Sequence, residues 1–365
     1  ALPARLSAAS AAVAGTGLDA LLVTPGPDLR YLTGYDAVPL ERLTCLVLPA
    51  AGDPLLVVPG LELAAAQASP VGELGIGIIT WGETEDPYAR VASVLANARS
   101  VGLDDRMWAS KVLLLRDAMP GVEQRRGGEV LGALRMVKSP DEVESLRRAG
   151  AAIDRVHASV PSLLRPGRTE REVGREIADR IIAEGHSRVD FIIVASGPNG
   201  ASPHHEVSDR VIQAGEAVVV DIGGTMPDGY CSDETRTYAT GDPGAEYLEA
   251  YAALQETQAL ASAAVRPGIE CEAVDAVARQ RLVEAGLGEF FIHRTGHGIG
   301  LETHEEPYIV TGNALPLAPG MVFSVEPGFY LPGRFGARIE DIIACGDAGP
   351  DVLNNSPRDL VIVDA

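Results

Sequence analysis

Two stretches, Gly215-Glu-Ala-Val-Val-Val-Asp221-Ile-Gly223 and Gly320-Met-Val-Phe-Ser-Val-Glu326-Pro-Gly328, decide the fold of the larger part of this 365-residue chain. Each contains a short apolar run, which is typical of a buried strand, and each carries a carboxylate at the same position. A second acid follows each stretch, Asp233 in Ser-Asp-Glu-Thr-Arg-Thr and Glu340 in Arg-Ile-Glu-Asp. The two stretches therefore predict two related strand units that each contribute a pair of carboxylates.

The segments before these strands repeat as well. Arg165-Pro-Gly167 followed by Gly185 recurs, 101 residues later, as Arg266-Pro-Gly268 followed by Gly286. Helix-like segments stand on both sides of Arg-Pro-Gly in each copy. A repeat of this kind indicates one supersecondary unit that is present twice. We therefore expect two αβ halves related by a pseudo-twofold axis, with the four carboxylates converging on it.

The N-terminal part predicts a small α/β domain. Residues 1–17 suit an amphipathic helix, and β-rich runs at 20–24, 45–48 and 55–58 are separated by Pro and Gly. A long helix then begins with Ser139 as cap, Pro140 at the first helical position and Glu142 reaching back. We expect the boundary between about residues 125 and 138, and assign residues 1–130 to the first domain and 131–365 to the second.

Charge, hydropathy and cysteine content exclude several classes of protein. The formal net charge of −21 disfavours binding to nucleic acid, because such a surface repels phosphates. The apolar runs are shorter than the ~20 residues of a membrane helix, and no secretory signal is visible. The four cysteines form no C-x-x-C pair, which fits a reducing cytoplasm. We expect a cytoplasmic protein with no nucleic-acid or membrane partner.

The acids and one histidine predict a metal centre. Asp221 closes the apolar run 217–220 and Glu326 closes 321–325, and a buried carboxylate is costly unless it is paired or binds metal. Either acid alone would suit a salt bridge or a capped turn, but four acids arranged by a repeat favour metal ligation. His297 lies among glycines, where the backbone can approach a ligand closely. Four carboxylates balance two divalent cations, and oxygen ligands with one imidazole suit Mn²⁺, Co²⁺ or Zn²⁺. Two such ions ~3.5–4 Å apart lower the pKa of bridging water toward ~7.

As a set, these motifs resemble the pita-bread metallopeptidases, the group of methionine aminopeptidase, aminopeptidase P, prolidase and creatinase. The resemblance covers residues 131–365 and rests on Val-Asp221-Ile-Gly, Ser-Asp233-Glu-Thr-Arg-Thr, Gly-His297-Gly-Ile-Gly-Leu-Glu-Thr-His304-Glu, Val-Glu326-Pro-Gly and Arg-Ile-Glu340-Asp. Asp28-Leu-Arg-Tyr-Leu-Thr-Gly-Tyr35 is similar to the N-terminal domain of the creatinase and proline-peptidase branch. The resemblance implies an α+β protein with a small α/β creatinase-type domain before a pseudo-twofold pita-bread catalytic domain.

The resemblance also implies roles for individual residues. Two divalent ions would be held by Asp221, Asp233, His297, Glu326 and Glu340, with Asp233 and Glu340 bridging. The family favours Mn²⁺ as the metal. Glu326 would also shuttle the proton of the bridging water, His204 would stand near the scissile bond, and His304 would stabilise the substrate oxyanion. His293, Arg338 and Tyr308 would position the substrate.

The expected reaction is hydrolysis of the Xaa-Pro bond of dipeptides by a metal-bridging hydroxide, as in prolidases. Creatinase lacks the metal ligands, methionine aminopeptidases usually lack such an N-terminal domain, and residues 304–313 resemble bacterial prolidases. Tyr308 departs from this pattern, because several prolidases carry there an arginine that clamps the substrate's C-terminal carboxylate. Xaa-Pro aminopeptidase activity on longer peptides therefore stays open, as do a non-catalytic peptide-binding protein and a side activity on esters. Relatives imply a homodimer whose N-terminal domain borders the partner's active site.

Overall fold

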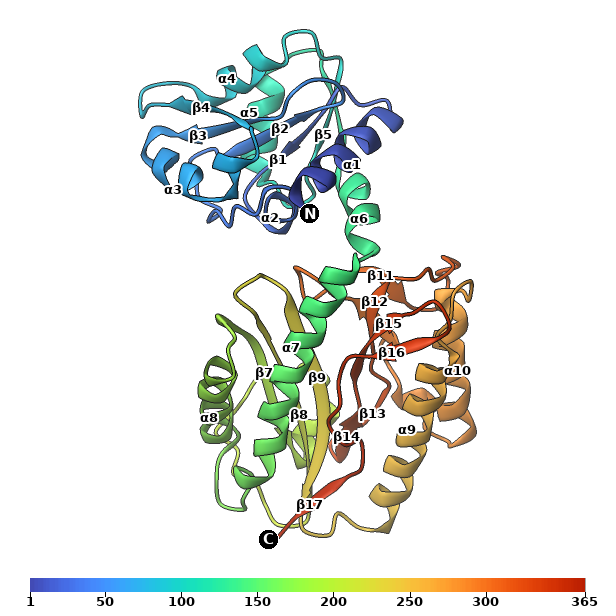
Figure 1. The fold of residues 1–365 in the computed structure, drawn as a ribbon. Coiled ribbons are helices and arrows are strands. Elements are labelled where there is room, and N and C mark those ends of the chain that lie inside the picture. Colours follow the sequence, from blue (N-terminus) through green and yellow to red (C-terminus); the bar gives the residue numbers. More distant parts are fainter. Residues whose placement is uncertain (365) are drawn as a thin grey trace. The chain divides into compact units, whose positions relative to one another are not determined.

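The computed structural model describes residues 1–364 and divides into two compact units, Ala1–Arg135 and Met136–Ala365. Figure 1 shows both, coloured along the sequence. The domain division predicted between residues 130 and 131 stays a prediction. Among residues 1–364, none of the helices combines the length and the apolar character needed to cross a bilayer.

The N-terminal unit is built on one mixed sheet with the strand order β4-β3-β2-β1-β5-β6. The predicted runs form β1 (Ala20–Val23), β2 (Cys45–Pro49) and β3 (Leu55–Pro59), and the predicted first helix is α1 (Leu2–Gly15). These predictions are confirmed to within two residues. The remaining strands are β4 (Gly77–Trp81), β5 (Ser100–Leu103) and β6 (Glu123–Arg126). The remaining helices are α2 (Pro27–Thr33), η1 (Gly60–Glu62), α3 (Leu63–Ala68), η2 (Pro70–Glu73), α4 (Pro87–Val94), α5 (Ala109–Ala118) and α6 (Gly128–Met136).

The first half of the C-terminal unit places two helices against a four-stranded sheet. The sheet has the order β17-β9-β8-β7. Its strands are β7 (Arg188–Ser196), β8 (Glu216–Thr225), β9 (Cys231–Thr240) and the distant β17 (Val361–Val363), and its helical segments are α7 (Pro140–Ser159), η3 (Val160–Ser162), α8 (Glu170–Ala183) and η4 (Gly197–Ala201). The predicted capping box at Ser139 and Glu142 starts α7 and is confirmed. Helix α7 packs on β9 and α8 on β7, and their apolar side chains close over β8.

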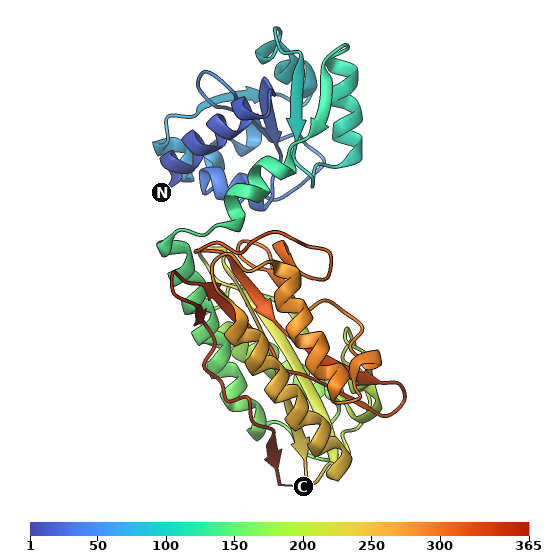
Figure 2. The same ribbon diagram turned by 90° about the vertical axis from the view of Figure 1, so that its right-hand side faces the viewer.

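The second half repeats this plan. Its elements are α9 (Ala245–Ala264), α10 (Cys271–Glu284), η5 (Gly288–Phe290), β10 (Gly296–Gly298), β11 (Glu305–Ile309), β12 (Val322–Val325), β13 (Gly328–Leu331), β14 (Phe335–Arg338), β15 (Asp341–Cys345) and β16 (Pro350–Val352). Strands β11-β10-β12-β15-β16 form one sheet, and β13 pairs with β14. Helices α9 and α10, gold and orange in Figure 2, lie over the strands of this unit.

The repeat seen in the sequence is present in the backbone. An isolated bridge joins Thr169 to Val211 in the first half, and another joins Glu270 to Pro316 in the second. Thr169 and Glu270 are 101 residues apart, which is the offset of the Arg-Pro-Gly motifs. One boundary differs, because β8 does not end before Asp221. Pairing with both neighbours continues to Thr225, so Asp221 lies inside a strand, whereas Glu326 directly follows β12.

Candidate active site

A cavity of about 600 Å³ in the C-terminal unit collects almost all the residues that the sequence singled out. The predicted residues that line it are His204, Asp221, Asp233, His293, His297, His304, Glu326, Arg338 and Glu340. Tyr308 is not among the lining residues. It contacts one of them, because the guanidinium carbon of Arg294 lies 4.2 Å from the Tyr308 ring centroid.

Strand pairing explains why residues from both halves meet here. Asp221 lies opposite Thr235 in the β8–β9 hairpin, so Asp233 is its diagonal neighbour. In the second half Val325 pairs with Asp341, which places Glu326 and Glu340 next to each other at the ends of β12 and β15. Ligand atoms of Asp233, His297 and Glu340 all lie within 4.8 Å of one another. Asp233 and Glu340 therefore meet across the two halves.

Glycines allow the strand that carries His297 to approach its neighbours. A Cβ atom on Gly296 would lie 1.8 Å from the Ser324 carbonyl oxygen, and one on Gly298 would lie 2.3 Å from the Glu306 carbonyl oxygen. Both distances are too short for any side chain, so the Gly-His-Gly sequence is a steric requirement of this position.

The contacts of His297 orient its ring. Nδ1 lies 3.1 Å from the Gly298 carbonyl oxygen, which can only accept, so we assign the proton to Nδ1. Nε2 then faces the acids, 3.1 Å from Glu326 Oε1 and 3.5 Å from Asp233 Oδ2. The Ser324 hydroxyl donates to Glu326 Oε1 at 2.9 Å and accepts from the His297 backbone N–H at 3.0 Å. Ser324 thereby holds two of the proposed ligands in a fixed relation.

The acids fit a site for divalent cations. Among residues 1–364, Asp221 Oδ1 and Glu340 Oε1 are buried without a hydrogen-bond partner. Burial, together with the neighbouring carboxylates, raises the pKa of both Asp233 and Glu340 well above the usual range. Buried oxygens that lack partners and repel each other need positive charge, and carboxylate oxygens with one imidazole suit Mn²⁺, Co²⁺ or Zn²⁺.

Arg338 supplies part of that charge. Its Nη2 lies 2.5 Å from Asp221 Oδ2, and its Nε donates at 3.1 Å to the Thr235 hydroxyl, which in turn donates to Glu340 Oε2 at 2.7 Å. Its Nη1 donates to the Tyr330 hydroxyl, which lies 2.8 Å from His293 Nε2. Tyr330 is thus a site residue that the sequence analysis missed, and burial raises its pKa to about 12.

Two further histidines of the cavity have lowered pKa values. Burial and the adjacent His297 lower the pKa of His304 to about 4, and the two rings lie 3.9 Å apart between centroids. Burial also lowers the pKa of His293. Both imidazoles are therefore neutral at pH 7. His304 can donate or accept a hydrogen bond at a substrate carbonyl or amine, whereas both ring nitrogens of His293 contact the protein, at the Arg294 carbonyl oxygen and the Tyr330 hydroxyl. His204 is exposed at the same cavity.

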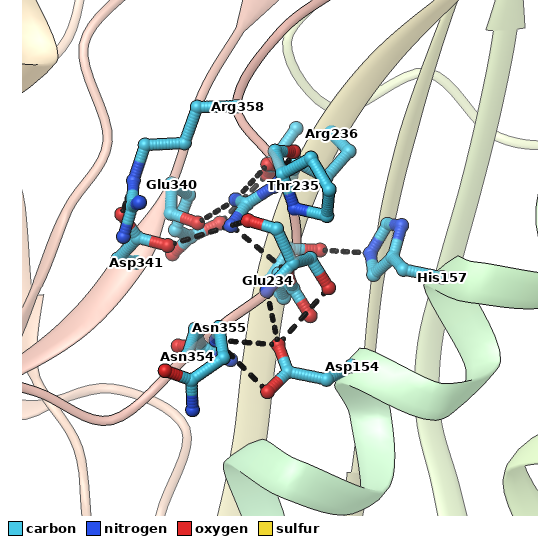
Figure 3. Close-up of polar contacts among 12 residues, drawn as sticks. Asp154, His157, Glu234, Thr235, Arg236, Glu340, Asp341, Asn354, Asn355 and Arg358 are labelled. Carbon is cyan, nitrogen blue, oxygen red and sulfur yellow. Dashed lines mark hydrogen bonds and ion pairs between the residues drawn. The ribbon is translucent and has the colours of Figure 1, made fainter. Parts of the chain in front are cut away.

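An ion network lies directly behind Glu340 (Figure 3). Arg236, from β9, donates to the Glu340 and Ser356 carbonyl oxygens and pairs with Asp341 at 2.7 Å. Its Nη2 also lies 3.1 Å from Glu234, whose pKa is raised well above its usual value by burial. Arg236 thereby joins the strand of Asp233 to the strand that follows Glu340.

The remaining cavity wall was not predicted. It is formed by Phe191, Ile192, Ile193, Pro203, His205, Glu206 and Arg294. Phe191 to Ile193 lie in β7, where an apolar run reads as core, so the sequence offered no signal for them. For Arg294 the sequence did offer a signal, because this residue directly follows the predicted site residue His293. It is the arginine of the cavity wall that has no carboxylate partner within residues 1–364.

Comparisons with known proteins identify the family of this chain. Residues 144–347 match the family described as metallopeptidase family M24, and residues 5–137 match the creatinase/prolidase N-terminal domain. The chain is 54% identical over 360 residues to a protein named probable dipeptidase PepE of Mycobacterium tuberculosis, covering 98% of this chain and 96% of that protein. It is 36% identical over 346 residues to an Xaa-Pro dipeptidase of Lactobacillus helveticus, covering 92% of both.

Solved structures agree with these matches. The crystal structure of dipeptidase PepE from Mycobacterium ulcerans superposes with a TM-score of 0.95 at 53% identity, covering 100% of this chain and 98% of that one. A recombinant prolidase from Thermococcus sibiricus gives a TM-score of 0.93 at 37% identity, covering 100% and 99%. The predicted α+β fold, with a creatinase-type domain before a pita-bread domain, is confirmed.

Proposed function

This chain belongs to metallopeptidase family M24, and we propose that it hydrolyses the Xaa-Pro bond of dipeptides. The observation that carries the proposal is the meeting of Asp233, His297 and Glu340 within 4.8 Å in a cavity also lined by Asp221 and Glu326. The relative named Xaa-Pro dipeptidase supports the substrate class.

The five ligands proposed are Asp221, Asp233, His297, Glu326 and Glu340. Asp233 and Glu340 come from different halves and meet with His297 within 4.8 Å, so both would hold metal where the halves face each other. Mn²⁺ is the metal we favour, with Co²⁺ and Zn²⁺ as alternatives that the same ligand set accepts. When bound, the ions would supply the Lewis-acid charge that activates water at neutral pH.

The other side chains bind and orient the peptide and move its protons. Glu326, held by Ser324, accepts the proton released by the attacking water and returns it to the leaving proline nitrogen. Neutral His304 donates to the scissile carbonyl as charge develops on its oxygen, and His204 donates to the same carbonyl. His293 is oriented by the Tyr330 hydroxyl and Arg338 by Asp221, so both side chains are held in fixed positions at the wall of the cavity.

The dipeptide preference rests on Arg294. A dipeptide carries its C-terminal carboxylate on the proline, close to the scissile bond. Arg338 is already paired with Asp221, whereas Arg294 is stacked on Tyr308 and has no acid partner among the described residues. We assign the substrate carboxylate to Arg294, with Tyr308 supporting its guanidinium. Arg294 would then do the work that an arginine at position 308 does in several prolidases.

A peptide panel tests the proposal. Hydrolysis of Ala-Pro, Ala-Pro-Ala and Met-Ala-Ser is followed with Mn²⁺ and with chelator. We expect Ala-Pro to be cleaved far faster than the others, and only in the presence of metal. Preference for Ala-Pro-Ala would establish an Xaa-Pro aminopeptidase, and cleavage of Met-Ala-Ser alone would refute proline specificity. No turnover of any peptide would favour a peptide-binding protein without catalysis.

Location and assembly are part of the same proposal. All four cysteines are free and buried, which supports a reducing, cytoplasmic location. We also propose a homodimer, on the resemblance to dimeric relatives alone. Sedimentation of the protein at working concentration tests this, and a monomer would contradict it.

A further inference from the structure

Glu170, the first residue of α8, is fully buried and receives hydrogen bonds from the end of β7, from η4 and from the segment after η4. Its Oε1 accepts from the Ser196 backbone N–H and hydroxyl at 2.8 Å each and from Asn199 Nδ2 at 3.0 Å. Its Oε2 accepts from the Ser208 N–H at 3.2 Å and hydroxyl at 2.6 Å, and lies 2.7 Å from His205 Nε2. Burial opposes ionisation, but these contacts together lower the Glu170 pKa, so the group is a carboxylate.

The segment that Glu170 holds runs along the cavity. After η4 ends at Ala201, the chain reaches β8 at Glu216 without another helix or strand, apart from a single bridge at Val211. Pro203, His204, His205 and Glu206 from this segment line the cavity. The His204 side chain has no hydrogen-bond partner within residues 1–364, so its neighbours must set its position.

The main side-chain anchor of this segment near His204 is the His205–Glu170 pair. His205 is largely buried, with 16% of its side chain exposed, and its Nε2 points to a carboxylate that is itself 0% exposed. Ser208 adds two more contacts to the same oxygen. Arg210 fixes the far end of the segment, because it pairs with Glu216 and donates to the Ser196 hydroxyl at 2.7 Å.

We propose that Glu170 is a positioning residue that acts through His205 to fix His204 at the substrate. The inference rests on the proposed function, since His204 is assigned there to the scissile carbonyl. Glu170 itself never touches the substrate. A displacement of about 1 Å in a group that contacts the reacting atoms can lower the rate by about 100-fold. Loss of the buried contact that positions His204 should therefore lower the rate.

Kinetic coupling tests the proposal. The variants are Glu170→Gln, His204→Ala and the double variant, with Ala-Pro as substrate. Glutamine keeps the size of Glu170 but replaces one carboxylate oxygen with an N–H₂ group that faces other donors, so one of the two sets of donors loses its acceptor. We expect Glu170→Gln to lower kcat/KM by about 10- to 100-fold in the native background. In the His204→Ala background, the same change should cost less than about 3-fold. An equal loss in both backgrounds would overturn the proposal.

Two further measurements separate positioning from folding. Glu172→Gln is the matched control, because Glu172 lies in the same first turn of α8 but is exposed and caps only the helix. It should leave kcat/KM within about 2-fold. If Glu170→Gln folds poorly, His205→Leu should show the same coupling to His204, and His205→Gln, which keeps an N–H donor, should recover activity relative to His205→Leu.

Imidazole ¹H–¹⁵N spectra give a readout that is independent of activity. The chemical shifts of the His204 ring should change in Glu170→Gln and should remain unchanged in Glu172→Gln. Unmoved His204 signals would refute the positioning role even if the native protein cleaved no peptide. Failure of the native protein to cleave Ala-Pro would instead refute the proposed function.

Discussion

Glu326 has two expected duties, as a metal ligand and as the group that moves the proton. Its Oε1 accepts from Ser324 and faces His297. Burial raises the pKa of Glu326, but the contact with His297 and the nearby His293 and Arg338 outweigh it and hold the pKa below the usual range. We expect Glu326→Ala to lower kcat for Ala-Pro by at least about 1,000-fold while the circular dichroism spectrum stays unchanged. Full activity in this variant would contradict both duties.

Arg294 carries the prediction about specificity. Arg294→Gln keeps a polar side chain but removes the charge that is expected to bind the substrate carboxylate. A charge-assisted bond of this kind is worth about 1.5–3 kcal/mol, so KM for Ala-Pro should rise by about 10- to 100-fold with little change in kcat. Arg281→Gln, which breaks a partly exposed pair with Glu256, is the control. Equal kcat/KM for Ala-Pro in native and Arg294→Gln proteins would exclude the carboxylate role.

Asp221 and Glu326 could be identified because each follows an apolar run, and His297 because it lies among glycines. The repeat pointed to Asp233 and Glu340, and the family resemblance to the other histidines. Tyr330 and Glu170 could not be identified in this way, for a physical reason. Their chemistry comes from partners brought close by tertiary pairing, such as His293 for Tyr330 and His205 for Glu170. From the sequence alone, a tyrosine in a strand is expected to be a core residue, and a glutamate at the start of a helix is expected to stabilise the helix terminus.

At the level of secondary-structure elements, Arg236 ties β9 to the segment around β15 (Figure 3). Its guanidinium is almost fully buried and sits between Glu234 and Asp341. Arg236→Met would leave these acids buried without their cation, and should lower the free energy of unfolding by about 3–5 kcal/mol. Arg334→Met, which breaks an exposed pair with Glu246, should cost less than about 1 kcal/mol. Urea denaturation of both variants checks this, and equal losses would contradict it.

The contact between α7 and β9 gives the protein a dependence on pH. His157 lies between Tyr238 and the Glu234 carbonyl oxygen, and burial, with the charge of Arg236, lowers its pKa to about 3. The unfolded chain binds a proton at pH values where the folded chain does not. His157 therefore removes stability as pH falls from about 6.5 toward 3, by up to about 1.4 kcal/mol per pH unit.

Replacing His157 tests whether this residue lowers the stability of the folded protein as the pH falls. The free energy of unfolding of His157→Gln should fall less steeply than that of the native protein between pH 6.5 and pH 5. Denaturant titrations at several pH values measure the two slopes. Parallel slopes would show that His157 does not titrate differently on unfolding.

Element prediction succeeded where local signals were strong, as in the capping box at Ser139 and the short strands of the N-terminal unit. It failed where pairing decides the outcome. The parallel pairing of β17 with β9 joins residues more than a hundred positions apart, and β8 continues through Asp221 because it has partners on both sides. No pattern within a single segment contains that information.

For the whole molecule, the internal repeat is the feature that joins fold and chemistry. Each half supplies two carboxylates, and the halves meet so that Asp233 and Glu340 become neighbours. The repeat and the capping box at Ser139 could be predicted from the sequence, as could the presence of the acids and His297 at one cavity. The cavity wall could not, because β7 and the segment around His204 reach it only through the packing of the first half.

We expect two divalent ions to bind between the two halves of the C-terminal unit. Crystals grown with Mn²⁺ and measured by anomalous diffraction on both sides of the manganese absorption edge test it most directly. We expect two peaks in this cavity, held by Asp221, Asp233, His297, Glu326 and Glu340, with Asp233 and Glu340 touching both. A single peak, no peak, or ions coordinated without Asp233 and Glu340 would contradict the account.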